Sequence, residues 1–154
     1  MTCRLPIVSL TTLAIVVACS PANSPTNDKN TFSEYEVVLE KQILWEDIFS
    51  YEKNYIVFFY NETCSYCHEM MDNIIDFAEQ SIISTYFLDT NQNNVKFNKI
   101  GDPPKGYVSL DEFFIIGTPS LIEIDERIIV DHLVGLDDCL TYLSDKRIES
   151  NIIL

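Results

Sequence analysis

The chain is poor in positive charge. Only 10 of its 154 residues are lysine or arginine, against 24 aspartates and glutamates, which leaves a formal net charge of -14. Nucleic-acid binding needs an excess of basic side chains to neutralise phosphates, so we expect no nucleic-acid partner. Adsorption to an anionic lipid surface by charge is disfavoured for the same reason. The acidity itself indicates mainly a well-solvated surface.

Histidine is scarce as well, and the apolar stretch at the amino end is short. The two histidines, His68 and His132, lie far apart in the sequence. Cys64, Cys67 and His68 lie close together but do not complete a four-ligand zinc site, so we expect no metal centre. Residues 5–18 carry no charge and span 14 positions. A membrane-spanning helix needs about 20 apolar residues, so this stretch is too short to be one.

This amino-terminal stretch has the features of a secretory signal. Arg4 precedes the apolar residues, which end at Val16, Val17, Ala18 and Cys19. The ending resembles a bacterial lipobox. The resemblance implies that residues 1–18 are a lipoprotein signal peptide and that Cys19 becomes the lipidated first residue, anchored in a membrane. An ordinary cleaved signal that happens to contain Cys19 is the alternative.

A polar segment separates the signal from the rest. Residues 20–30 contain proline, serine and asparagine but no large apolar side chain, and such a composition buries too little surface to fold. We therefore expect a flexible tether over residues 19–34, reaching about 20 Å if it behaves as a random coil. Residues 35–150 are long enough for one domain with its own hydrophobic core.

Of the five cysteines, the resemblance to a lipobox implies that Cys3 leaves with the signal and that Cys19 carries the lipid. Cys64 and Cys67 form a Cys-x-x-Cys pair, which in this context indicates a redox site rather than a structural one. Cys139 falls on the apolar stripe of a predicted helix, so we expect it to be a small core residue.

Apolar patterns predict the elements around the pair. The run at residues 55–60 predicts a buried central strand, and the spacing from Cys67 to Ala78 predicts a helix packed on a sheet. The next strand, at residues 82–88, would pair in parallel through a right-handed crossover. The remaining expectations are an extended segment at 35–39, a helix at 41–53, a short helix at 109–114, antiparallel strands at 120–124 and 128–134, and a last helix at 136–150.

This order of elements resembles the thioredoxin-like superfamily, in which Cys-x-x-Cys opens a helix after a central strand. Thr118 and Pro119, within Gly-Thr-Pro-Ser, match the loop whose cis-proline faces the dithiol. The resemblance implies an α/β thioredoxin-like fold with a central mixed β-sheet flanked by helices. With the lipobox and tether, the chain is similar to bacterial membrane-anchored, extracytoplasmic thiol-disulfide oxidoreductases, among them accessory proteins linked to bacteriocin export.

The resemblance also implies roles. Cys64 is the nucleophile and Cys67 the resolving thiol, and the amino end of a helix independently favours a thiolate at Cys64. No cofactor is expected beyond the redox-active disulfide of the pair. Exported client proteins with thiols or disulfides, and a membrane or extracytoplasmic redox partner, are the expected partners. The active-site loop residues are Ser65, Tyr66, His68, Thr118 and Pro119.

Two departures from thioredoxin stand out. Many thioredoxins have a buried aspartate six residues before the first cysteine, a position that Phe58 occupies here. The dipeptide between the cysteines is Ser65-Tyr66 instead of Gly-Pro, and with Thr118 it looks more like disulfide isomerases and glutaredoxins. Oxidation or isomerisation is therefore slightly favoured over strong reduction, although the direction stays open.

Two other functions compete. Cys-x-x-Cys followed by His68 is also the attachment motif for c-type haem. A non-catalytic thioredoxin-like binding or export accessory module would use only the groove around Pro119, although the intact cysteine pair argues against it. In the redox interpretation, His68 either favours the thiolate when it is charged or is an ordinary solvated side chain.

Overall fold

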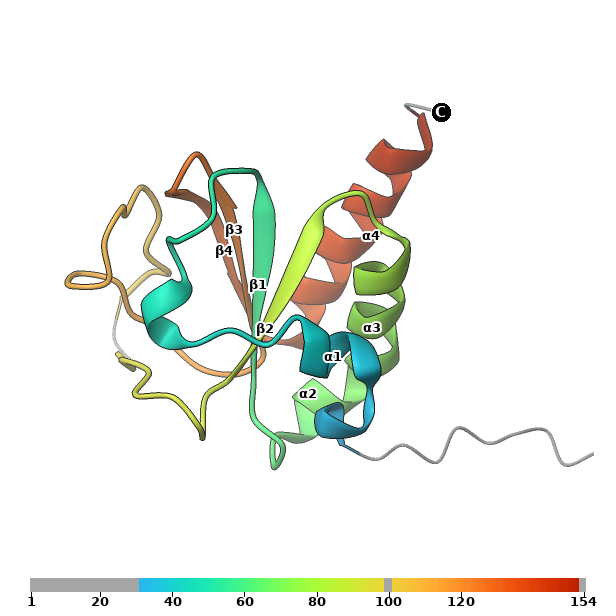
Figure 1. The fold of residues 1–154 in the computed structure, drawn as a ribbon, viewed down its shortest axis with the longest axis horizontal. Coiled ribbons are helices and arrows are strands. Elements are labelled where there is room, and N and C mark those ends of the chain that lie inside the picture. Colours follow the sequence, from blue (N-terminus) through green and yellow to red (C-terminus); the bar gives the residue numbers. More distant parts are fainter. Residues whose placement is uncertain (1–30, 99–100, 153–154) are drawn as a thin grey trace, which may run out of the picture.

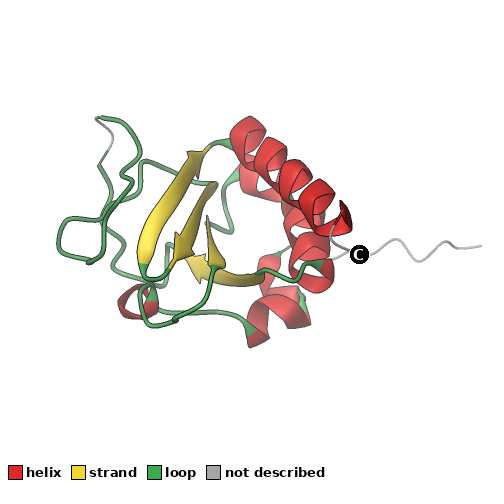
Figure 2. Cartoon of the chain, turned by 90° about the horizontal axis from the view of Figure 1, so that it is seen from above, coloured by secondary structure: helices red, strands yellow, loops and turns green. Residues whose placement is uncertain are grey.

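The computed structural model describes residues 31–98 and 101–152 (Figure 1). The expected signal peptide, Cys19 and most of the expected tether lie outside these residues. A four-stranded sheet has the order β2-β1-β3-β4, and the longer helices gather on one of its sides (Figure 2). The elements are η1 (Phe32–Glu34), α1 (Glu36–Glu40), η2 (Trp45–Asp47), β1 (Tyr55–Tyr60), α2 (Ser65–Glu69), α3 (Met71–Gln80), β2 (Ser84–Asp89), β3 (Ser120–Asp125), β4 (Ile128–Val134) and α4 (Leu136–Ile152), where η marks a short 3-10 helix.

Strand β1 is the central strand that the apolar run predicts, and all six of its residues are buried. It pairs in parallel with β2, Phe58 opposite Phe87, and antiparallel with β3, Phe58 opposite Leu121. Alternate β1 side chains enter two different core clusters, one under the helices and one under the loops. Burial on both faces explains why the run is apolar throughout instead of alternating.

The predicted helix after the cysteine pair is two helices, α2 and α3. They are separated at Met70, whose backbone has φ -97° and ψ 0° and whose side chain is fully buried. The apolar spacing continues across this break, so periodicity alone hides it. Helix α3 buries Ile74 and Phe77 in the helix-side core, and Cys139 of α4 lies in the same cluster, as expected.

The segment before β1 differs from the prediction. Residues 35–39 were expected to be extended but lie largely in helix α1, whereas the helix expected over 41–53 is absent except for the short η2. Instead, Lys41 O accepts the Phe87 amide at 3.0 Å and the Ile43 amide donates to Phe87 O at 2.9 Å. Residues 41–43 therefore pair with the edge strand β2, and these hydrogen bonds outweigh the helical periodicity of the segment.

The short helix expected over 109–114 is a turn. Lys96 Nζ donates to Leu110 O at 2.8 Å and to Asp111 O at 3.1 Å. In a helix, these carbonyl oxygens would accept backbone amides of the next turn. Phe113 is buried and stacks on Trp45 with their ring centroids 5.4 Å apart, so Trp45 is also a core residue.

The folded unit begins earlier than the expected boundary at residue 35. Phe32 is 0% exposed and its ring lies 4.4 Å from that of Tyr60. Residues 31–34 therefore belong to the domain and not to the tether. The strands β3 and β4 pair antiparallel as predicted, and Gly135, which follows β4, has φ +93°, a conformation that favours glycine.

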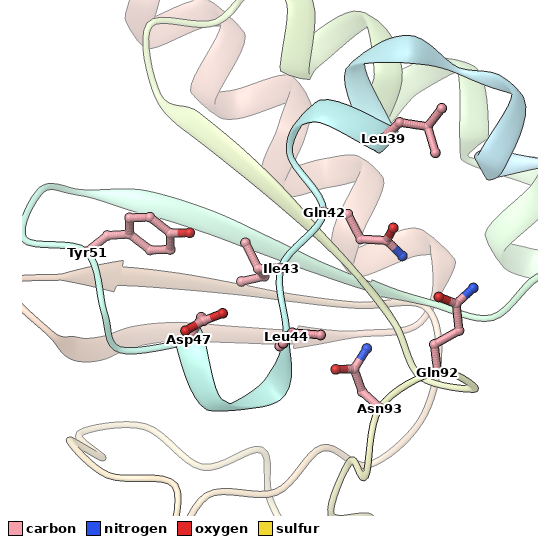
Figure 3. A pocket seen from close by; sticks show the side chains of 8 residues that line it. All are labelled: Leu39, Gln42, Ile43, Leu44, Asp47, Tyr51, Gln92 and Asn93. Carbon is pink, nitrogen blue, oxygen red and sulfur yellow. The ribbon is translucent and has the colours of Figure 1, made fainter.

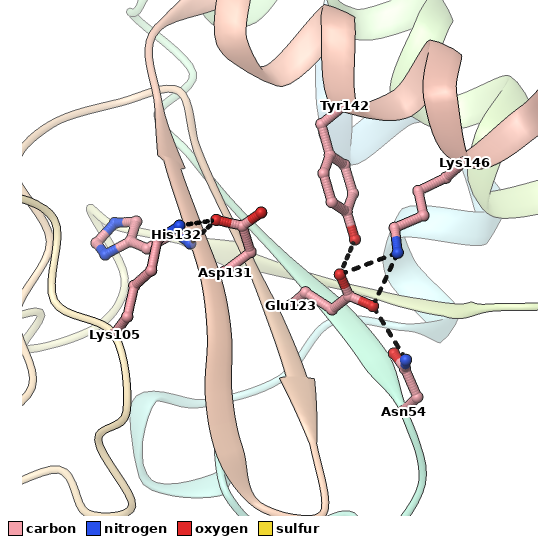
Figure 4. Close-up of polar contacts among 7 residues, drawn as sticks. All are labelled: Asn54, Lys105, Glu123, Asp131, His132, Tyr142 and Lys146. Atoms are coloured by element: carbon pink, nitrogen blue, oxygen red, sulfur yellow. Dashed lines mark hydrogen bonds and ion pairs between the residues drawn. The ribbon is translucent and has the colours of Figure 1, made fainter.

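A buried carboxylate ties α4 to the sheet (Figure 4). Glu123 of β3 accepts hydrogen bonds from Tyr142 Oη at 2.6 Å and Asn54 Nδ2 at 3.0 Å, and pairs with Lys146 Nζ at 3.2 Å. Burial raises the pKa of the Glu123 carboxyl, but these donors outweigh it and the net pKa is lowered. The group is therefore ionised and hydrogen-bonded at neutral pH.

His132 of β4 lies on the opposite, loop-covered face (Figure 4). Its ring is buried 5.8 Å from that of Phe113, and its backbone amide donates to Asp131 Oδ1 at 2.9 Å. Burial lowers the pKa of the imidazole to about 4. The folded protein therefore holds a neutral histidine near pH 5, where an unfolded chain would protonate it.

We predict an acid-sensitive stability that originates at His132. The unfolded chain takes up its proton near pH 6.5 and the folded chain only near pH 4, so stability is complete above pH 6.5 and falls by roughly 3 kcal/mol as the pH drops to 4. Urea unfolding at pH 7 and pH 4.5 measures this loss. In His132→Gln the loss between these two pH values should be much smaller, and an equal loss in both proteins would contradict the prediction.

Candidate active site

The cysteine pair sits where β1 ends and α2 begins. Cys64 is the residue that caps the amino end of α2, with extended backbone angles of φ -84° and ψ 114°. Its Sγ accepts the Cys67 backbone N–H at 3.3 Å. At this position the sulfur occupies the place of a capping group, and it accepts one of the backbone amides that the first helical turn leaves without a partner.

Cys67 is placed quite differently. Its side chain is 0% exposed, whereas Cys64 is half-buried, and both are free thiols. The pKa of the Cys67 thiol is raised to about 12, mainly by burial and also by the neighbouring Cys64, while hydrogen bonds with the Asn61 backbone and the Thr118 side chain act in the opposite direction. Cys67 therefore keeps its proton at neutral pH.

The loop before β3 faces the pair. The Thr118–Pro119 peptide bond is cis, as expected. The Cys64 thiol donates to Thr118 O with Sγ and O 3.4 Å apart. Pro119 O accepts the Gly135 amide at 2.9 Å, which joins this loop to the start of α4. The structure thus brings the Cys64 loop next to the Thr118–Pro119 loop, although Cys64 and Thr118 lie 54 positions apart in the sequence.

The other expected loop residues lie around Cys64. Ser65 is exposed, and Tyr66 is 57% exposed, so both can contact a bound partner. His68 is held: its Nε2 lies 2.6 Å from the carbonyl oxygen of Glu62, which requires the ring nitrogen to donate. His68 is therefore an anchored side chain and not a freely solvated one.

Comparison with known proteins gives structural matches only. No protein-family model matches the sequence, and a search of curated proteins finds no significant match. A thioredoxin variant from Halobacterium salinarum superposes with a TM-score of 0.50 at 18% identity, covering 71% of this chain and 88% of that one. A thioredoxin from Malassezia sympodialis gives 0.51 at 12% identity, covering 68% and 88%.

The fold is thioredoxin-like. At such low identity the likeness establishes the fold alone, including the central mixed sheet and flanking helices that the sequence predicts. The chemistry of the pair must therefore be argued from its own surroundings.

Phe58, six residues before Cys64, places an aromatic ring at the position where the sequence lacks an acidic side chain. Its ring is fully buried, 6.2 Å from Tyr60 and 5.7 Å from Phe32. Among the described residues, the groups that shift the Cys67 pKa are a thiol, a hydroxyl and a backbone amide, with no carboxylate. The Phe58 side chain itself offers no carboxylate that could take the Cys67 proton.

Sequence reasoning missed Asn61, which shapes the loop before Cys64. Its Oδ1 accepts the Thr63 amide at 2.8 Å and the Thr63 hydroxyl at 2.7 Å. Its side chain also exchanges two hydrogen bonds with Asn91, at 3.0 and 3.1 Å. The Asn-x-Thr pattern after a strand is a recognisable turn signal, so the sequence contained this information.

The haem alternative does not fit this geometry. The Nε2 atom of His68, which would have to ligate iron, is hydrogen-bonded to Glu62 O. The Cys67 side chain is fully buried, so its sulfur is not accessible for a thioether bond to haem.

Within residues 31–98 and 101–152, no cluster of three or more histidine, cysteine or acidic side chains could hold a metal ion. Over the same residues, no helix has the length and apolar character needed to cross a bilayer.

A separate hollow of about 320 Å³ opens beside η2, away from the dithiol (Figure 3). Neither cysteine of the pair lines it, so it is not assigned to the redox site. Its lining combines amide side chains with exposed leucines: Leu39, Gln42, Ile43, Leu44, Asp47, Tyr51, Gln92 and Asn93.

We predict that Cys67 resolves mixed disulfides slowly at neutral pH and faster in base. Because burial keeps its thiol protonated, the resolving rate should rise about tenfold per pH unit from pH 7 to 9. Reaction of the reduced protein with an aromatic disulfide separates two phases: attack by Cys64 and displacement by Cys67. Cys67→Ala, which lacks the second phase, is the control, and a rate that levels off below pH 8 would reveal an unrecognised base.

Proposed function

We propose that the chain is a thiol-disulfide oxidoreductase that acts on cysteines of exported proteins. One observation carries the proposal: a half-exposed Cys64 whose Sγ accepts the Cys67 amide at 3.3 Å, with Cys67 buried behind it. This asymmetry gives one thiol access to a partner protein and protects the other. It is the arrangement that two-step disulfide exchange requires.

The reaction balances as follows. Cys64 thiolate attacks one sulfur of a client disulfide, and the client's other sulfur leaves as a thiolate and takes up a proton. The Cys64–client bond is a mixed disulfide. Cys67 then loses its proton and attacks Cys64 Sγ, so the client's second sulfur leaves and is protonated. The client gains two electrons and two protons, and the pair becomes a disulfide; the reverse sequence oxidises a client dithiol.

Three features bear on direction. Phe58 provides no carboxylate that could accept the Cys67 proton, and the pKa of Cys67 is raised. Attack by Cys67 on a mixed disulfide is therefore slower, and the mixed disulfide persists longer, than with a base at that position. Ser65-Tyr66 replaces the Gly-Pro of thioredoxin, and Thr118 precedes the cis-proline. Persistence of the mixed state gives time for a client to rearrange its own disulfides. Oxidation or isomerisation is therefore favoured over strong reduction.

The proposed place of action is outside the cytoplasm, at a membrane. The support is the sequence pattern ending at Cys19, which resembles a lipobox, and the polar residues that follow it. Because Phe32 is buried in the domain, the proposed tether would end before it, earlier than the expected boundary at residue 34. A membrane or extracytoplasmic partner would reset the redox state of the pair, as for bacterial lipoprotein oxidoreductases, including those linked to bacteriocin export.

We predict that Cys67→Ala traps clients. Without the resolving thiol, the bond from Cys64 to an exported protein should persist as a mixed disulfide that reducing agent releases. Diagonal electrophoresis of cells expressing the variant would display these adducts, and mass spectrometry would identify them.

The matched control is the double variant Cys64→Ala/Cys67→Ala, which also removes the attacking sulfur. Adducts in both variants would mean that another thiol reacts. Absence of adducts in Cys67→Ala would favour a non-catalytic binding module.

A further inference from the structure

A carboxylate close to the dithiol is turned toward the amino-terminal segment of the domain. Glu62 lies two residues before Cys64 in the chain. Its Oε2 accepts the Phe32 amide at 3.1 Å and its Oε1 accepts the Ser33 amide at 3.1 Å. Both oxygens are thus engaged by residues about 30 positions earlier in the sequence. We refer to residues 31–34 as the arm.

The arm is also held by packing. Phe32 is fully buried, and its ring centroid lies 4.4 Å from that of Tyr60 and 6.2 Å from that of His68. Tyr60 is the last residue of β1, and His68 is in α2, the helix that begins between the two cysteines and contains Cys67. One arm side chain therefore packs near both the strand that leads into the dithiol and the helix that carries Cys67.

The backbone on either side of Glu62 connects to the reactive residues. Glu62 O accepts from His68 Nε2 at 2.6 Å, and the preceding carbonyl, Asn61 O, accepts the Cys64 amide at 3.0 Å. A shift of the loop at Glu62 would therefore displace two acceptors: Asn61 O, which holds the Cys64 amide, and Glu62 O, which holds the His68 ring.

We propose that Glu62 is a positioning residue that, through its clamp on the arm, holds Cys64 in its reactive geometry. The inference rests on the proposed function. The two arm amides direct the negative charge of Glu62 away from the position where a thiolate must form, and they fix the loop that presents it. The segment that would connect the domain to its membrane tether is thus part of the redox site.

A positioning role and a pure charge effect of Glu62 predict opposite changes in the reactivity of Cys64. If Glu62 acts only through its charge, its removal should speed reaction at Cys64, since a nearby anion disfavours a thiolate. If Glu62 acts by positioning, Glu62→Ala should slow it. Glu69, an exposed carboxylate of α2 two residues after Cys67, provides the matched control because Glu69→Gln removes a nearby charge without touching the arm.

The measurement is the rate at which iodoacetamide alkylates Cys64 in the reduced full-length chain at pH 7, read at that residue by tandem mass spectrometry. Glu62→Ala should lower the rate about threefold to tenfold, equivalent to one net hydrogen bond. Glu62→Gln, which keeps one acceptor oxygen and the side-chain shape, should recover part of it. Phe32→Leu should also slow the reaction, whereas Glu69→Gln should not.

Glu62→Ala reacting as fast as, or faster than, the original chain would overturn the proposal, and so would equal slowing in Glu69→Gln. If Glu62→Ala does not fold, as thermal unfolding would show, Glu62→Gln and Phe32→Leu decide in the same way. A parent chain whose pair never exchanges disulfides would remove the proposed function, yet the order of alkylation rates would still judge the clamp.

Discussion

Strand β1 is buried on both faces, and this constraint determines where the reactive groups lie. Its side chains fill one core beneath α3 and α4 and a second core beneath the loops that contain Phe113 and Trp45. A strand held in this way cannot shift its register without exposing aromatic rings to water. The end of β1 at Tyr60 is therefore a fixed point, and the loop that follows it begins the redox site from a rigid support.

From that fixed point the structure gives two chemically similar residues different properties. Cys64 ends a turn stabilised by Asn61 and faces Thr118, whereas Cys67 lies one helical turn further on and inside the core. Exposure gives Cys64 access to a partner, and burial keeps the proton on Cys67. The same burial makes the missing carboxylate at Phe58 consequential, because a buried thiol without a base is slow to become a nucleophile.

The sequence was most informative where one local pattern dominated. The continuous apolar run of β1 and the strand pair β3–β4 were predicted well because burial on known faces controls each of them, and the helical spacing after Cys67 was predicted except for the break at Met70. The cysteine pair and the cis Thr118–Pro119 loop were recognisable because both are carried by short motifs.

The failures came from contacts between distant segments. The segment at 41–43 pairs with Phe87 on the edge of β2, and no local periodicity reports a free edge elsewhere in the chain. Phe32 was assigned to the tether because its neighbours are polar, and only the aromatic contact with Tyr60 brings it into the core. The Glu62 clamp escaped detection for the same reason, since its acceptors meet amides about 30 residues away.

The proposed function requires a reversible two-electron couple at Cys64 and Cys67. Equilibrating the purified chain with defined ratios of reduced and oxidised glutathione, then mapping the disulfide by mass spectrometry, tests this directly. We expect a bond between Cys64 and Cys67 that forms and breaks reversibly, with Cys139 still a thiol, at a potential less reducing than the approximately -270 mV of thioredoxin. A pair that never closes at any ratio, or a potential at the thioredoxin value, would contradict the account.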